Sequence, residues 1–335
     1  MTEIQNRQIR LAARPVGLPK PEDWEFTTEA ALQPAEGEAL VRVSYLSLDP
    51  AMRGWMNEGK SHIEPVAIGE VMRALGVGQV VVSNDPSLAV GDFVTGLTGV
   101  QEYAVLKAKH VTKVDPRLAP LPVHLSVLGM PGMTAYFGLF AIGQPKAGET
   151  VVVSSAAGAV GATVGQLAKI PGCRVVGIAG GREKCKYIVE ELGFDAAIDY
   201  KCEDIAKSLQ EHCPNRIDVY FDNVGGDILD ACLAHLAMKG RVVVCGAISQ
   251  YNNTTPVRGP SNYLSLLVNR GRMEGMVVMD YAGRFGHAVR DMAKWMAEGK
   301  LKSREDVAEG LETFPETLLK LFTGENFGKL VLKVA

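Results

Sequence analysis

The second half of the chain alternates short apolar runs with helical segments, and this alternation restricts the possible folds more than any other feature. The apolar runs are rich in valine and isoleucine, as in strands that are covered on both faces of a sheet. Helical crossovers between such strands are what a parallel sheet requires. The sequence therefore predicts an α/β fold with a doubly wound parallel sheet. The expected strands are 150–155, 173–180, 196–200, 217–224, 241–246 and 272–280, and a closing helix is expected over 284–299.

The first part of the chain has a different pattern. Alternating or continuously apolar runs over 38–48, 74–84 and 92–106 are separated by turn residues, which predicts mostly β-structure. The C-terminal segment returns to a strand, a helix and a strand, and we expect it to rejoin the first domain. The expected organisation is a discontinuous domain of residues 1–122 and 299–335, and a second domain of residues 123–298.

Composition narrows the class of protein. A chain of 335 residues exceeds the length at which one core usually keeps growing, which agrees with two domains. A formal net charge of −3, with scattered Lys and Arg, argues against a nucleic-acid partner. No run has the length of a membrane helix, and the N-terminus lacks the apolar core of a secretory signal. We therefore expect a cytoplasmic protein without a membrane or nucleic-acid partner.

The cysteines are unevenly distributed. All six follow residue 172, and none forms a Cys-x-x-Cys pair. This arrangement favours reduced thiols, each a small core residue, over a disulfide framework or a zinc site. The expected thiols are Cys173, Cys185, Cys202, Cys213, Cys232 and Cys245.

The loop after the first of the predicted parallel strands reads AAGAVG. Ala156 occupies the first position of a Gly-x-Gly-x-x-Gly motif, and Gly158 and Gly161 occupy the other two. A strand, a small-residue loop and a helix in this order turn tightly and direct backbone N–H groups toward a pyrophosphate. Ala is tolerable at the first position, which needs a compact turn rather than contact with phosphate. The alternative is a loop that is merely tightly packed.

The end of the second predicted strand bears on which dinucleotide binds. NAD-preferring folds place an acidic residue there, but this chain has Gly180 and Gly181, followed by Arg182 and Lys184. Glycines leave room for a 2′-phosphate and cations pair with it, so NADP(H) is the predicted cofactor. A methyltransferase would also be expected to use an acidic residue at this position. The two cations could instead belong to an ordinary solvated helix start.

Seven segments in the order found here resemble the medium-chain dehydrogenase/reductases. More narrowly, the chain resembles their zinc-independent branch, which contains the leukotriene dehydrogenase/prostaglandin reductases and the bacterial NADPH-dependent curcumin reductases. The resemblance implies a GroES-like, mostly β catalytic domain joined to a Rossmann domain, and a homodimer. It also implies NADPH-dependent reduction of the carbon–carbon double bond of α,β-unsaturated ketones and aldehydes. The segments are 46–56, 130–139, 156–169, 191–201, 221–226, 245–252 and 325–334.

The same resemblance implies roles for individual residues. Lys184 is expected to bind the 2′-phosphate, Tyr200 to lie at the adenosine end, and Tyr251 to be the catalytic tyrosine that donates to the developing enolate oxygen. The pyrophosphate is expected to bind at Ala157, Gly158, Ala159, Val160 and Gly161. The nicotinamide side is expected to be formed by Asn223, Cys245, Gly246, Ala247, Ile248, Ser249, Tyr251, Met276, Val277, Val278 and Asn326.

The first domain lacks the residues of a catalytic zinc site. No cysteine precedes Cys173, and Gly69 and Glu70 have no adjacent histidine, so we expect no metal. Two further departures from the family pattern are Ala51 and Val100, where relatives commonly have aromatic residues. Both are expected to face the substrate and to widen its pocket.

Two other functions remain open on the sequence alone. The neighbouring zinc-free branch of the family accepts quinones with the same fold, so a quinone reductase is one alternative. A protein that binds NADPH without turnover is the other.

Overall fold

The computed structural model describes residues 4–59 and 61–334. The chain divides into two compact units: a first unit of Met1–Leu125 and Glu305–Ala335, and a second unit of Ser126–Arg304. The boundaries expected from the sequence were residues 122 and 298, so both boundaries lie a few residues later in the structure. The segment after residue 298 is bound to the second unit because the side-chain amide of Gln166 donates to the carbonyl of Lys302 at 3.0 Å and accepts its N–H at 2.8 Å.

The second unit contains a six-stranded parallel sheet in the order β10-β9-β8-β11-β12-β13. From β8 the chain runs outward to β10, then crosses back to β11 and continues to the opposite edge, which confirms the doubly wound sheet. The strand order therefore reverses between β8 and β11, where doubly wound sheets bind ligands. The strands are β8 (Thr150–Ser154), β9 (Arg174–Ala179), β10 (Ala196–Asp199), β11 (Ile217–Asp222), β12 (Leu236–Val244) and β13 (Arg272–Gly275).

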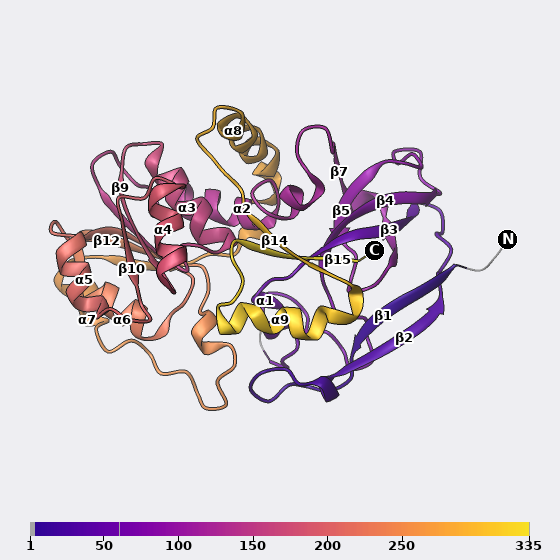
Figure 1. Ribbon diagram of the computed structural model, residues 1–335, viewed down its shortest axis with the longest axis horizontal. Helices are drawn as coiled ribbons and strands as arrows, with labels where there is room; N and C mark the ends of the chain where they lie inside the picture. Colours follow the sequence, from indigo (N-terminus) through magenta and orange to yellow (C-terminus); the bar gives the residue numbers. More distant parts are fainter. Residues whose placement is uncertain (1–3, 60, 335) are drawn as a thin grey trace. The chain divides into compact units, whose positions relative to one another are not determined.

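Helices cover this sheet (Figure 1). Helix α3 packs on β8 and β9, and α2 packs on α3 and α8, whereas α5, α6 and α7 form a separate contiguous layer. Among the described residues, no helix is long and apolar enough to cross a membrane. The helices are α2 (Met130–Phe137), α3 (Ala159–Lys169), α4 (Arg182–Glu190), α5 (Ile205–His212), α6 (Gly226–Ala234), α7 (Leu264–Val268) and α8 (Phe285–Ala297).

Two expectations for the second unit were wrong. The last strand ends at Gly275 rather than at residue 280, and a 3-10 helix begins at Val278. This strand is at the sheet edge and pairs only with β12, which ends at Val244, so the following residues have no partner strand. Cys202 is exposed rather than buried, and Cys185 and Cys245 are only partly buried. All six cysteines are free thiols.

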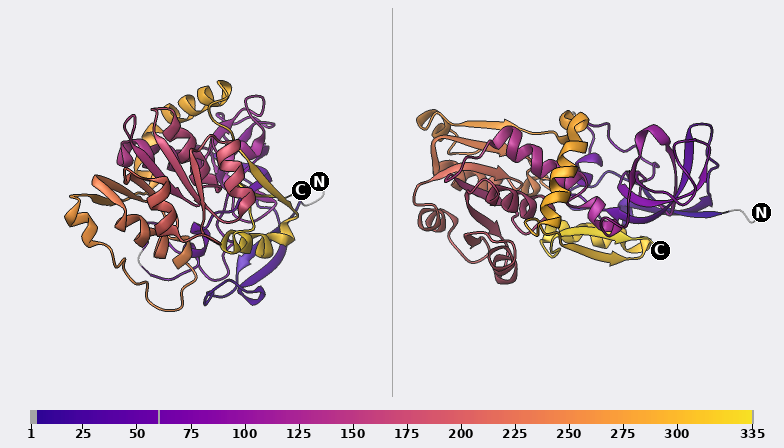
Figure 2. Two further views of the ribbon diagram at one scale, coloured as in Figure 1. Left: turned by 60° about the vertical axis from the view of Figure 1, so that its left-hand side comes forward. Right: turned by 90° about the horizontal axis from the view of Figure 1, so that it is seen from above.

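The first unit is mostly β-structure, as predicted. It contains a two-stranded sheet of β1 and β2 and a seven-stranded sheet in the order β14-β15-β3-β4-β5-β7, with β6 also paired to β3. The C-terminal β15 lies beside β3 from the start of the chain, as its yellow ribbon shows in Figures 1 and 2. The expected strand over 92–106 is two strands, β5 and β6.

The elements of the first unit are β1 (Gln5–Leu11), β2 (Trp24–Ala30), β3 (Glu38–Ser47), α1 (Ala51–Trp55), β4 (Leu75–Ser83), β5 (Phe93–Leu97), β6 (Tyr103–Lys107), β7 (Thr112–Val114), β14 (Glu305–Glu309), α9 (Phe314–Thr323) and β15 (Lys329–Lys333).

The structure corrects the expectation for Val100. Its side chain is 0% exposed and belongs to the apolar core of the first unit, with neighbours that include Ile9, Met72 and Phe314. It therefore cannot line a substrate pocket. Ala51 is exposed at the start of α1.

Replacing Val100 with tryptophan tests this placement. Because the core is closed around Val100, Val100→Trp should lower the free energy of unfolding by about 1–3 kcal/mol through overpacking. The exposed Ala51→Tyr should change it by less than about 0.5 kcal/mol. Denaturant unfolding of both variants gives the comparison. A Val100→Trp protein that unfolds like the wild type would show that the core has room for the ring.

Candidate cofactor site

The turn between β8 and α3 is tightly packed. Ser155 has a positive φ of 52°, and its carbonyl accepts the N–H of Gly158 at 2.9 Å. A Cβ on Gly161 would lie 2.3 Å from that carbonyl oxygen. Only glycine therefore lets the first turn of α3 approach the loop, as the sequence motif predicted.

Ala156 replaces the first glycine of the motif, and the neighbouring strand explains why this is possible. Its side chain is 0% exposed, and its N–H donates to the carbonyl of Ile178 in β9 at 3.0 Å. The residue that faces it on β9 is Gly177, where a Cβ would lie 2.8 Å from the methyl of Ala156. The methyl group thus fills the space that a glycine on the adjacent strand leaves. This loop is a tightly built turn rather than a degraded one.

Helix α3 begins at Gly158, the N-cap residue, which has no side-chain cap. The N–H groups of the first helical turn have no partners within the helix, and the helix dipole adds partial positive charge there. Ala157 is buried, whereas Gly158, Ala159 and Val160 are partly exposed. Gly161 is buried like Ala157, so only the middle three of the five predicted pyrophosphate residues reach the surface, at a helix N-terminus of the kind that suits an anion.

A residue at the end of β10 binds the backbone that follows β9. Asp199 is buried, and its Oδ1 accepts the N–H of Gly181 at 2.8 Å and that of Lys201 at 3.1 Å. These contacts lower the pKa of the Asp199 carboxyl, against the opposing effect of desolvation, which is the largest single cause. A Cβ on Gly180 would lie 2.8 Å from the ring of Tyr200, whereas one on Gly181 would meet nothing within 4 Å.

Tyr200 therefore lies against the backbone at the end of β9, and Lys184 follows in the first turn of α4. Tyr200 is 43% exposed beside Gly180, and Gly181, with a φ of 95°, caps α4 next to open space. Lys184 is half-buried in the first turns of α4, and Arg182 is exposed. The position at which NAD-preferring folds have an acidic residue is occupied by Gly180 and Gly181, as the sequence indicated.

The turn after β12 holds the predicted catalytic tyrosine. The hydroxyl of Tyr251 accepts the N–H of Ala247 at 3.1 Å, which leaves its own proton for another acceptor. It sits close to Gly246, where a Cβ would lie 2.9 Å from the hydroxyl oxygen. Burial is the main cause that raises the pKa of Tyr251, so the phenol stays protonated at neutral pH.

The remaining predicted residues fall in two places. The N–H of Met276 donates to the carbonyl of Val244 at 3.1 Å, so Met276, Val277 and Val278 follow the end of β13 beside the turn that starts at Cys245. Met276 and Val277 lie outside any strand, and Val278 begins a 3-10 helix, so the strand expected there is not formed. Asn326 belongs to the first unit, where its side-chain amide donates to the carbonyl of Gly328 at 3.1 Å.

Asn223 is held by the neighbouring strand. Its N–H donates to the hydroxyl of Ser154 at 2.9 Å, and its side-chain amide donates to the carbonyl of Ser154 at 2.8 Å. The next residue back, Asp222, is buried and accepts several hydrogen bonds. Neither Ser154 nor Asp222 was singled out from the sequence. A polar residue at the end of an apolar strand is the signal that could have identified them.

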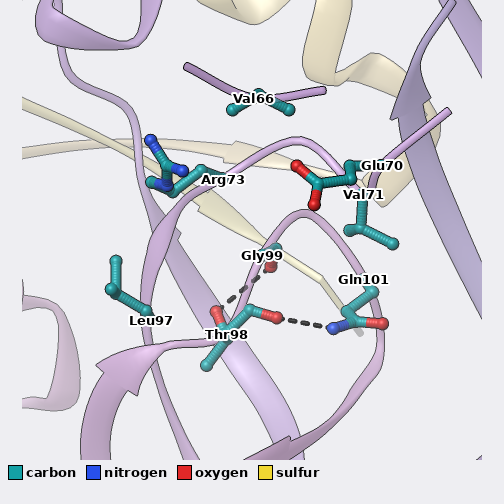
Figure 3. Close-up of a pocket in the computed structure, with 8 residues that line it drawn as sticks. All are labelled: Val66, Glu70, Val71, Arg73, Leu97, Thr98, Gly99 and Gln101. Atoms are coloured by element: carbon teal, nitrogen blue, oxygen red, sulfur yellow. Dashed lines mark hydrogen bonds between the residues drawn. The ribbon is translucent and has the colours of Figure 1, made fainter. Parts of the chain in front are cut away.

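A separate pocket of about 240 Å³ lies in the first unit and contains none of the predicted site residues (Figure 3). Glu70 at its rim accepts the N–H of Ala67 at 2.8 Å, and Gln101 donates to the carbonyl of Thr98 at 2.7 Å. The side chains of Glu70 and Gln101 thus stabilise turns of the first unit. The pocket is lined by Val66, Glu70, Val71, Arg73, Leu97, Thr98, Gly99 and Gln101.

Two family models match the chain. Residues 7–114 match the N-terminal domain of oxidoreductase, and residues 159–298 match zinc-binding dehydrogenase. In the described part of the chain, no three His, Cys, Asp or Glu side chains gather as metal ligands would.

Close relatives match over the full length. The chain is 45% identical to NADPH-dependent curcumin reductase of Escherichia coli, with 99% of this chain and 97% of the relative covered. It is 42% identical to the NADP⁺-dependent 2-alkenal reductase of Nicotiana tabacum, with 99% and 98% covered. The structure of CurA from Vibrio vulnificus in complex with NADPH matches with a TM-score of 0.94 and 46% identity, covering 98% of this chain and 99% of that one. The chain therefore belongs to the medium-chain dehydrogenase/reductase family, in the branch of the curcumin and prostaglandin reductases that its sequence segments indicated.

Proposed function

We propose that this protein reduces the carbon–carbon double bond of α,β-unsaturated ketones and aldehydes with NADPH. The observation that carries the proposal is the full-length similarity to reductases named for NADPH and for alkenals. The geometry of the second unit supports it. The backbone N–H groups at the start of α3 suit a pyrophosphate, and Gly180 and Gly181 stand where an acidic residue would repel a 2′-phosphate.

The residues of the proposed site have separate roles in binding NADPH and in the reaction. When bound, NADPH supplies a hydride for the β-carbon of the substrate, so that negative charge develops on the substrate's carbonyl oxygen. The N-terminal turn of α3 binds the pyrophosphate, and Lys184 binds the 2′-phosphate. Tyr251 donates its hydroxyl proton to the carbonyl oxygen in a hydrogen bond that strengthens as the charge develops. Asn223 and the residues from Cys245 to Ser249 line the nicotinamide side.

Turnover assays distinguish the proposal from its alternatives. With NADPH, we expect an alkenal or a simple enone to be consumed with a higher kcat/KM than a naphthoquinone, because the tyrosine donor suits a single carbonyl oxygen. A preference for the quinone would replace the proposal with a quinone reductase. Tight NADPH binding without consumption across an enone panel would indicate a binding protein.

We also propose that the enzyme works without a metal, in the cytoplasm. The cysteine and the histidine beside Glu70 that a zinc site of this family would need are missing from the first unit's sequence, and free thiols suit a reducing compartment. Metal analysis of the active protein should find no stoichiometric zinc, and a chelator should leave turnover unchanged. A zinc ion required for turnover would refute the metal-free mechanism.

A homodimer is the proposed assembly, formed through the edge of the parallel sheet. Strand β13 is exposed along its length, and beside it α7 exposes Leu264, Leu267 and Val268. An unpaired edge next to an apolar patch is a typical association surface. Antiparallel pairing of two copies about Met273 would set Arg272 of each opposite Glu274 of the other. Sedimentation should therefore give twice the chain mass, and a monomer would contradict this arrangement.

Lys184 provides a test of cofactor recognition. Lys184→Ala should raise the KM for NADPH about tenfold, the equivalent of about 1.4 kcal/mol, and leave that for NADH unchanged, because only NADPH carries the 2′-phosphate. Lys186→Ala is the matched control: Lys186 lies on the same helix and pairs with Glu190 at 3.7 Å. Equal losses with both cofactors would show that Lys184 does not recognise the phosphate.

Tyr251 provides a test of the chemical step. Tyr251→Phe should lower kcat by about 10²–10³-fold, the usual loss when one donor to a developing oxyanion is removed. The affinity for NADPH, measured by titration, should change much less. Tyr263→Phe, at a tyrosine 57% exposed in the same region of sequence, is the control and should keep full turnover. Full activity in Tyr251→Phe would mean that another group stabilises the oxygen.

A further inference from the structure

The carboxyl end of β11 carries a buried acid that the proposed mechanism leaves unused. Asp222 is 1% exposed, and its Oδ1 accepts the N–H of Gly225 at 2.9 Å, the N–H of Val224 at 3.0 Å and the hydroxyl of Tyr220 at 2.8 Å. Its distance to the hydroxyl of Ser154, from β8, is 3.4 Å. One carboxyl oxygen of Asp222 thus binds groups at the end of β11 and in the turn after it, and lies close to the end of the neighbouring β8.

These contacts stabilise the turn between β11 and α6. Gly225 and Gly226 both have positive φ, 70° and 57°, so the chain reverses sharply between β11 and α6. A carboxylate that accepts the N–H groups two and three residues ahead stabilises such a turn. An ionised carboxylate is also a stronger acceptor than a neutral group. Burial raises the pKa of Asp222, while its donors oppose that shift.

The backbone of Asp222 and Asn223 also binds the turn that carries Tyr251. The carbonyl of Asp222 accepts the N–H groups of Cys245 at 2.9 Å and Gly246 at 3.1 Å. The carbonyl of Asn223 accepts the N–H of Ile248 at 3.2 Å. Two residues after Cys245, the N–H of Ala247 binds the Tyr251 hydroxyl. The position of the tyrosine oxygen therefore depends on the backbone at Asp222 and Asn223.

We propose that Asp222 is a positioning residue for the reductase reaction, which acts through Asn223 and through the turn that holds Tyr251. This rests on the proposed function, since it assigns Tyr251 to the reaction. It also predicts an effect on cofactor binding that is independent of any substrate. Because Asp222 shapes the nicotinamide side and makes no contact with the 2′-phosphate residues, NADPH and NADH should be affected alike.

The same strand offers a matched control. Asp218 lies at the opposite end of β11, and its Oδ2 accepts the N–H of Thr150 in β8 at 2.8 Å. Burial raises the pKa of Asp218 as well. Both acids therefore join β11 to β8 and are partly or fully buried, but only Asp222 lies at the edge with the cofactor loops. Asp222→Ala and Asp218→Ala should both lower the melting temperature.

Binding and exchange measurements separate positioning from stability. In Asp222→Ala, the Kd values for NADPH and NADH should rise by the same factor of about tenfold, and amide exchange should accelerate in 223–226 and 245–251, because buried N–H groups lose their acceptor. Asp222→Asn keeps the Oδ1 acceptor and should restore most of both. Asp218→Ala should show neither change. Equal behaviour of Asp222→Ala and Asp218→Ala in binding and exchange would overturn the proposal.

Turnover gives the remaining readout. If the wild type reduces enones, kcat should fall at least about tenfold in Asp222→Ala and be largely recovered in Asp222→Asn, while Asp218→Ala keeps the wild-type kcat. If the wild type reduces no enone, the proposed function fails, and the Kd and exchange data still decide whether Asp222 shapes the cofactor loops. Should Asp222→Ala not fold, Ser154→Ala replaces it. That variant removes the acceptor of the Asn223 N–H, and unchanged Kd values in it would overturn the proposal.

Discussion

The meeting of β8 and β11 at the centre of the parallel sheet is the constraint on which the second unit depends. Their order forces the chain to leave in opposite directions, so a gap opens between the two loops that follow. Hydrogen bonds from Asn223 to Ser154 close the strand ends below that gap. Each of the two strands is then followed by a tight turn. The turn after β8 contains Gly158 and Gly161, and the turn after β11 contains Gly225 and Gly226.

Backbone rather than side chains supplies most of the proposed cofactor surface. The turn before α3 offers N–H groups because Gly161 lets the helix approach the carbonyl of Ser155. Asp199, at the end of β10, accepts the N–H of Gly181, which follows β9, so the nearby carboxylate is buried and bound to backbone. A carboxylate is therefore used to shape the loop instead of binding a ribose. This arrangement explains how a chain without the usual acidic residue fixes the end of β9 and still leaves open space at Gly181.

The errors of the sequence analysis have physical causes. Val100 was compared with an aromatic position in relatives, but its side chain alternates into the core between Gly99 and Gln101, which border a pocket. The apolar run after Gly275 looked like a strand, yet no partner strand continues beside it at the sheet edge. Cys202 was expected in the core because cysteine usually is, but it follows β10 in an exposed turn. In each case the local sequence did not show which neighbours the residue has in the folded chain.

The sequence by itself determined the fold class, the succession of strands and helices along the second domain, the glycine turn and the cofactor, because periodicity, steric limits on glycine and missing acidic residues are local properties. The family followed from segments spread over the whole length. Only the tertiary structure showed that Ala156 packs against Gly177 and that Asp222 organises two loops, since these contacts join residues from separate strands. Hydrogen bonding between distant segments has no periodic trace in a single sequence, so its partners become visible only when the sheet has formed.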